Sequence, residues 1–180
     1  MTQAAPVLQG LPPLLDANTR LVVLGSFPGV ASLRAQQYYG HPQNQFWKIM
    51  ATLLSSDAAI VLTMAYAERV QWLLNQGVGL WDVYAACERE GSLDAHIQNA
   101  QPNDLQSLRA HCPVLAAIAH NGGESFRHAK AVKKALQDAA CGERVLIHRL
   151  PSTSPANASW TFEQKLSAWQ AVMNTHGMLA

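Results

Sequence analysis

The sequence predicts an α/β domain in which a parallel sheet is covered by helices on both faces. Short, continuous apolar runs recur along the chain, as in strands that are buried on both sides. Segments with helical periodicity separate these runs, and such alternation is typical of βαβ connections. Polar or turn-forming residues follow each run. They should therefore gather at the carboxyl ends of the strands, where ligands of parallel sheets bind.

The elements of this fold can be placed approximately. Four strands are expected at Leu21–Gly25, Val78–Tyr84, Val114–Ala119 and Val145–Leu150. Helices are expected at Phe46–Leu54, Thr63–Gln76 and Glu124–Ala140, from about Asp104, and from Thr161, which has capping-box spacing to Gln164. The polar segment 85–101 shows no clear pattern. Residues 1–20 are expected to form an N-terminal arm or a short packed segment before a single domain at 21–180.

Composition restricts the function only weakly. The 180 residues are 49% hydrophobic and 14% charged, which is sufficient for one domain with a sizeable core. A net charge of +1 permits a nucleic-acid partner, but any basic surface must then be local. The chain has neither an apolar run as long as the ~18 residues of a membrane span nor a signal-peptide pattern, so we expect a cytoplasmic protein.

Cysteine and histidine usage argues against a metal centre. The three cysteines, Cys87, Cys112 and Cys141, are widely spaced and form no CxxC pair. This favours reduced thiols over a disulfide scaffold or a cysteine zinc site. The seven histidines show no HExxH or comparable spacing. We therefore expect neither a metal nor another cofactor.

The most informative stretch follows the first strand. Gly25, Ser26, Phe27, Pro28 and Gly29 form a turn that is neither a Walker loop nor a GxGxxG fingerprint, and it could be purely structural. However, the aromatic and amide residues of Tyr38–Trp47 come next, and such side chains on a loop at a strand end suggest a binding site.

Several residues at the strand ends have two interpretations each. Asn44 could begin the helix at Phe46 as an N-cap, or act as a catalytic amide. Asp82 could be an internal cap or ion pair, but a carboxylate in a buried strand can also be functional. Tyr39 could belong to the core, or stack on a flat heterocycle.

Two further turns are ambiguous in the same way. Asn121-Gly122-Gly123 could simply start a helix, and Pro151–Pro155 could be a rigid loop. Small hydroxyls and free backbone N–H groups at such places also suit a phosphate, which applies to Ser152, Thr153 and Ser154.

Two long stretches resemble motif one of the hypoxanthine-DNA glycosylases (DNA-deoxyinosine glycosylases), a branch of the uracil-DNA glycosylase superfamily. They are Gly25-Ser26-Phe27-Pro28-Gly29 and Tyr38-Tyr39-Gly40-His41-Pro42-Gln43-Asn44-Gln45-Phe46-Trp47. Later stretches resemble the later motifs of the family in the same order: Leu80–Val83, Gly91–Asp94, Pro102–Asp104, His120–Gly123 and Leu150–Asn157. The resemblance covers roughly residues 20–170.

This resemblance implies a three-layer α/β/α sandwich with a four-stranded, mostly parallel sheet. It also implies a monomeric, monofunctional DNA repair enzyme without a cofactor. Such an enzyme hydrolyses the N-glycosidic bond of a flipped deaminated base in DNA, here hypoxanthine, and leaves an abasic site.

The resemblance also implies roles for individual residues. Phe27 stands where many superfamily members carry the Asp or Asn that positions water, so catalysis moves to Asn44. Phe27 would then be a wall of the base pocket, which is shaped by the turn Gly25–Gly29. The remaining implied contacts are Tyr39, Asp82 and Asn121 to the base, and Ser152, Thr153 and Ser154 to phosphates.

Two alternative functions remain. One is a uracil or mismatched-thymine glycosylase. Phe27 disfavours it, as does Leu150, which stands where uracil-specific relatives use a histidine. The other is a non-catalytic nucleic-acid-binding module on the same sheet.

Overall fold

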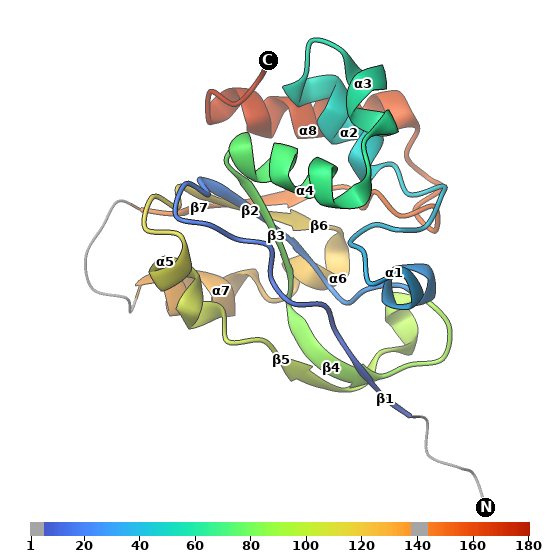
Figure 1. The fold of residues 1–180 in the computed structure, drawn as a ribbon. Coiled ribbons are helices and arrows are strands. Elements are labelled where there is room, and N and C mark those ends of the chain that lie inside the picture. The colour runs from blue at the N-terminus through green and yellow to red at the C-terminus, as the bar shows by residue number, and fades with distance from the viewer. Residues whose placement is uncertain (1–5, 138–143) are drawn as a thin grey trace, which may run out of the picture.

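The structure, a computed structural model, describes residues 6–137 and 144–180. Its central sheet has the strand order β3-β2-β6-β7 (Figure 1). These strands are β2 (Leu21–Gly25), β3 (Val78–Asp82), β6 (Ala117–Asn121) and β7 (Leu146–Leu150). Each neighbouring pair is parallel. The predicted α/β/α class with a four-stranded parallel sheet is therefore confirmed.

Strand β2 separates two hydrophobic cores, which explains its continuous apolar sequence. Leu21 and Val23 point into one core, and Val22 and Leu24 point into the other. The first core lies under α2 (Phe46–Leu54), α3 (Ala58–Thr63), α4 (Tyr66–Asn75) and α8 (Phe162–Thr175) (Figure 1). The second lies above α5 (Leu108–His111), α6 (Gly123–Phe126) and α7 (Ala129–Gln137).

A second, antiparallel sheet has the strand order β1-β4-β5. It consists of β1 (Val7–Gln9), β4 (Tyr84–Glu88) and β5 (Gln98–Pro102), with the 3-10 turns η1 (Asp94–His96) and η2 (Leu105–Ser107) beside it. The predicted single strand Val78–Tyr84 is therefore wrong. The chain passes from one sheet to the other at Val83, whose N–H donates to Gly25 and whose carbonyl accepts from Asn103.

The N-terminal segment belongs to the domain from residue 6 onward. Strand β1 pairs with β4, and Leu14 exchanges two backbone hydrogen bonds of 2.9 Å with Leu80 in β3. Of the two expectations for residues 1–20, the described part fits a packed segment rather than a free arm.

Several predicted boundaries are also corrected. The helix expected at Thr63–Gln76 begins later, as α4 at Tyr66, and the short helix α3 before it, which Asp57 caps, was not predicted. Helix α1 (Val30–Ala35) was missed. The strand expected at Val114–Ala119 starts later, because Leu115 closes a turn on Cys112, and it extends to Asn121.

Of the other predicted helices, some are confirmed, and one was expected to end outside the described residues. The helix expected at Glu124–Ala140 is divided into α6 and α7, and its predicted end lies outside the described residues, as does Cys141. Helix α2 has the predicted bounds, and Thr161 caps α8 through Gln164 as expected. Over residues 6–137 and 144–180, no helix is long and apolar enough to cross a membrane.

Candidate functional site

The carboxyl ends of the parallel strands bring the predicted site residues together. Gly25 at the end of β2 is in register with Asp82 at the end of β3, and Asn121 of β6 is in register with Leu150 of β7. The loops that follow these residues therefore start side by side, as the sequence predicted.

Gly25 allows a close approach that no other residue would permit. A Cβ atom at this position would lie 2.3 Å from Asp82 Oδ1 and 3.5 Å from the hydroxyl of Tyr39. The carboxylate and the phenol thus meet over the backbone of Gly25. This contact, rather than a special backbone angle, explains the glycine at the end of β2.

Asp82 is a buried carboxyl group without an ion-pair partner among the described residues. Its side chain is 4% exposed, and its Oδ2 has no hydrogen-bond partner. Burial and the nearby charge of Asp94 raise the pKa of Asp82 to about 7, against a smaller lowering by Arg89. The structural alternative for Asp82, an internal ion pair, is not what the structure shows.

Tyr39 covers Asp82 in an unfavourable conformation. Its φ of 55° lies in the left-handed region, and its ring stacks on Phe46 with a centroid distance of 4.1 Å and a 28° angle between planes. Its hydroxyl is buried, and in the part of the chain that the structure describes it has no hydrogen-bond partner. Burial and the charge of Asp82 raise the pKa of Tyr39 well above its usual range. Strain and an unsatisfied polar group in one residue are typical of a functional position.

Asn121 and Thr153 hold two of the loops together. Asn121 Nδ2 donates to Thr153 Oγ1 and Thr153 N donates to Asn121 Oδ1, both at 3.0 Å. The carbonyl of Thr153 accepts from Gln45 N, also at 3.0 Å. Thr153 is fully buried in this structure, and its predicted contact with a DNA phosphate stays a prediction. Asn121 has both side-chain atoms engaged and acts here as a brace between the loops.

Asn44 shows the capping interaction and still keeps a free donor. Its Oδ1 accepts from Phe46 N at 3.0 Å, although Gln45, which makes no side-chain capping hydrogen bond, occupies the N-cap position of α2. Its Nδ2 has no hydrogen-bond partner within the described ranges. The structure therefore fixes the orientation of this amide and leaves its NH₂ group available to a ligand.

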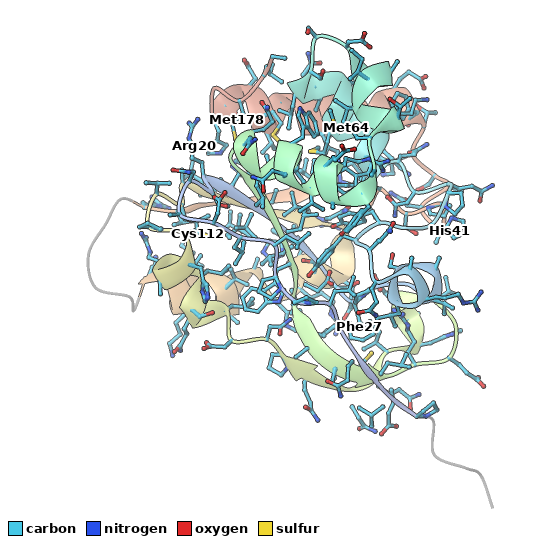
Figure 2. All side chains as sticks on the ribbon, in the orientation of Figure 1. Arg20, Phe27, His41, Met64, Cys112 and Met178 are labelled. Atoms are coloured by element: carbon cyan, nitrogen blue, oxygen red, sulfur yellow. The ribbon has the colours of Figure 1, made fainter. Side chains whose placement is uncertain are left out.

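A hollow of about 480 Å³ lies beside Asn44. It is lined by the segment 37–45 and by residues of α2, α3 and α4. The lining residues are Gln37, Tyr39, Gly40, His41, Pro42, Gln43, Asn44, Gln45, Trp47, Lys48, Leu62 and Arg69. Figure 2 shows His41 at the outer edge of this region. Asp82 does not line the hollow, but Tyr39 does, so Tyr39 separates it from the buried carboxyl group.

The loop after β7 has a compact internal structure. Ser152 Oγ accepts from Ser154 N at 3.2 Å, and Ser154 Oγ accepts from Ala156 N at the same distance. Lys165 of α8 is 2% exposed and donates to the carbonyl of Ser154 at 3.4 Å. Burial lowers the pKa of Lys165. Both serines remain partly exposed, and their predicted contacts with phosphates stay predictions.

Phe27 does not lie in the same core as Tyr39. It is 6% exposed and packs with Trp81 and Tyr84 in the second core, below the sheet in Figure 2. The guanidinium of Arg89 lies over its ring, 5.1 Å from the centroid. In this structure the Phe27 side chain supports the turn from beneath, and its interpretation as a wall of the base pocket stays a prediction.

The segment 89–94 holds the turn Gly25–Gly29 in place, a role that the sequence did not predict. Arg89 Nη2 donates to the carbonyl of Pro28, and Ser92 Oγ accepts from Val30 N at 2.9 Å. Ser26 Oγ donates to Asp94 Oδ1 at 2.7 Å. Local pattern could not reveal these contacts, since Ser26 and Asp94 are 68 residues apart. The only signal was the match of Gly91–Asp94 to a family motif.

Removing the hydroxyl of Thr153 tests the brace. Thr153→Val keeps the shape of the side chain but leaves the buried Asn121 Nδ2 without its partner, so the free energy of unfolding should fall by about 1–3 kcal/mol. Urea denaturation measures this. In Thr52→Val, a matched change on the exposed face of α2, the effect should stay within about 0.5 kcal/mol. Equal losses in both variants would contradict the role of the brace.

The pKa of Asp82 predicts how stability depends on pH. Because the pKa is raised in the folded protein, ionising Asp82 opposes folding, and this cost accumulates as pH rises from about 4 to 7. The stability of Asp82→Asn relative to wild type should therefore increase from pH 4 to pH 8, by on the order of 4 kcal/mol. Denaturation of both proteins at each pH cancels the effects of other groups. A difference that is independent of pH would contradict the assignment.

Comparisons with known proteins identify the family of the chain. Residues 12–173 match the model of the Uracil DNA glycosylase superfamily. A hypoxanthine DNA glycosylase from Methanosarcina acetivorans is 36% identical over 166 residues, which are 92% of this chain and 98% of the relative. One from Methanosarcina barkeri is 38% identical over 117 residues, 65% of this chain and 72% of the relative. The solution structure of a candidate uracil DNA glycosylase from Methanosarcina acetivorans, 33% identical, superimposes with a TM-score of 0.79 and covers 94% of this chain and 98% of that one. The chain belongs to the uracil-DNA glycosylase superfamily.

Proposed function

We propose that this chain excises hypoxanthine from DNA by hydrolysing the N-glycosidic bond of a flipped deoxyinosine. The observation that carries the proposal is the arrangement around Tyr39. The free amide of Asn44 lines a hollow on one side, and the unpaired carboxyl group of Asp82 lies on the other. The similarity to two hypoxanthine DNA glycosylases supports the same substrate.

Asp82 supplies a reason for selecting hypoxanthine over adenine. Hypoxanthine carries a hydrogen at N1, which an ionised carboxylate accepts. Adenine has a lone pair at N1, which the same carboxylate repels, and a buried polar group left without a partner is costly. Since the pKa of Asp82 is about 7, this discrimination should weaken as pH falls below neutrality.

Asn44 is the catalytic amide of the proposal. As the bond to the sugar breaks, the sugar gains oxocarbenium character and the base gains negative charge. A preorganised N–H donor aimed at that charge stabilises the transition state more than the ground state. The hydrogen bond from Phe46 N to Asn44 Oδ1 holds the amide in one orientation, so its Nδ2 is directed before the substrate binds.

Tyr39 must move if one base is to contact both groups. Its ring occupies the position on Phe46 that a flat base would take, and it separates the hollow from Asp82. Its left-handed φ and unpaired hydroxyl make this position weakly favoured. We infer that a flipped base displaces the ring and then stacks with it, while Ser152 and Ser154 contact flanking phosphates.

The substrate is tested directly on DNA. The protein is incubated with duplexes that carry inosine, uracil, xanthine or a G·T mismatch, and alkali then cleaves any abasic site. We expect breaks at inosine. Breaks at uracil alone would instead identify a uracil glycosylase, and a mobility shift without breaks would identify a binding module.

The role of Asn44 predicts the effect of one substitution on this activity. Asn44→Ala should lower the single-turnover rate on inosine DNA by about 100-fold or more, because a donor to the developing charge is lost. Asn75→Ala is the matched control, since Asn75 is exposed at the end of α4. Near-normal activity of Asn44→Ala would remove Asn44 from catalysis.

A further inference from the structure

Hydrolysis needs a group that takes a proton from the attacking water, and the residues discussed so far do not provide one. Phe27 is apolar and buried. An amide such as Asn44 orients water but does not become its proton acceptor. Asp82 lies sealed beneath Gly25 and Tyr39, and in the proposed function it contacts the base.

Asp94 is a carboxylate anchored to the motif-one turn. Its Oδ1 accepts from Ser26 Oγ at 2.7 Å, and within residues 6–137 and 144–180 it is the only carboxylate bonded to a side chain of the turn 25–29. Its Oδ2 has no hydrogen-bond partner among these residues, and Asp94 is exposed to solvent. One oxygen is thus held in place by Ser26, while the other has no such partner.

The position of Asp94 is fixed close to the base-contacting residues. Ser26 directly follows Gly25, which touches Asp82, and the charge of Asp94 raises the pKa of Asp82. The bonds from Arg89 to Pro28 and from Val30 to Ser92 hold the whole segment 89–94 against the turn. Three separate contacts therefore set where the carboxylate lies.

We propose that Asp94 is the general base that activates the water for attack on C1′ of the flipped deoxyinosine, and this rests on the function proposed above. The water oxygen forms a bond to C1′ as its proton passes to Asp94. The C1′–N9 bond breaks, its electron pair stays with the base, and hypoxanthine takes up a proton from solvent. Asp94 then returns its proton to solvent, leaving an abasic sugar with a 1′-hydroxyl group.

The surroundings of Asp94 determine whether its carboxyl group is protonated or ionised. Although the residue as a whole is exposed, its carboxyl group is partly desolvated at the contact with Ser26. This desolvation and the charge of Glu124 raise the pKa of Asp94, and the hydrogen bond from Ser26 and the charge of Arg89 oppose the rise. The charge of Asp94 in turn acts on Asp82, and also on Tyr84 and Cys87. A raised pKa brings a carboxylate closer to the operating pH, which favours proton transfer.

Single-turnover kinetics on an inosine duplex test the proposal. Asp94→Asn keeps the size of the side chain and its acceptor for Ser26, so folding and DNA affinity should persist while the rate falls by about 100-fold. Asp94→Glu, which keeps a carboxylate, should recover part of the rate. In wild type, protonation of Asp94 should lower the rate at acidic pH. In Asp94→Asn this part of the pH dependence should be absent. Glu90→Gln, an exposed carboxylate in the same segment, serves as the matched control.

The outcomes separate the two proposals. If wild type does not release hypoxanthine, the proposed function fails and this inference fails with it. If wild type is active and Asp94→Asn stays within about twofold of it, only the role of Asp94 is overturned. A rate loss that parallels a loss of DNA affinity or of thermal stability would show a structural role instead, and would also overturn the inference.

Discussion

The hydrogen bonds that meet at Thr153 determine the geometry of the whole site. Two of them join this residue to Asn121 at the end of β6, and a third joins its carbonyl to Gln45 at the start of α2. The orientation of Asn44, one residue earlier, depends on this connection. A buried threonine in the loop after β7 thereby positions an amide more than 100 residues away in the sequence. Such a second layer of support is what keeps a catalytic group in a productive geometry.

Around this brace the fold tolerates groups that would be unfavourable elsewhere. Tyr39 has a left-handed backbone, and its hydroxyl, Asp82 Oδ2 and Gln45 Oε1 are all buried without partners. Most buried polar groups in proteins are satisfied, so the unsatisfied hydroxyl of Tyr39 and the unsatisfied carboxyl oxygen of Asp82, which approach each other at Gly25, mark a place that is prepared for a ligand. A base with an N–H donor and a carbonyl acceptor would supply partners for these groups in the recognition we propose.

The sequence predicted the elements whose evidence is local. The apolar run of β2 and the helical periodicity of α2 were placed correctly, because each pattern reports burial directly. The alternation of apolar runs with helical segments predicted the parallel sheet, and the family resemblance supplied the catalytic role expected of Asn44. The sequence pattern failed to predict positions that are determined by packing between residues far apart in the sequence. It did not predict that Thr153 and Phe27 are buried supports, and Asp94 was passed over because its partner, Ser26, lies 68 residues away. The sequence also did not predict that the chain passes from one sheet to the other at Val83, because this too depends on contacts between distant residues.

The central claim is that one flipped base contacts both Asn44 and Asp82 after Tyr39 has moved off Phe46. The most direct measurement is a crystal structure of the protein with a duplex that contains a non-hydrolysable deoxyinosine analogue. The account predicts an extrahelical hypoxanthine with its N1 at the carboxylate of Asp82, and with Asn44 Nδ2 within hydrogen-bond distance of the purine. A flipped base that binds with Tyr39 still stacked on Phe46, and with Asp82 still sealed, would contradict it.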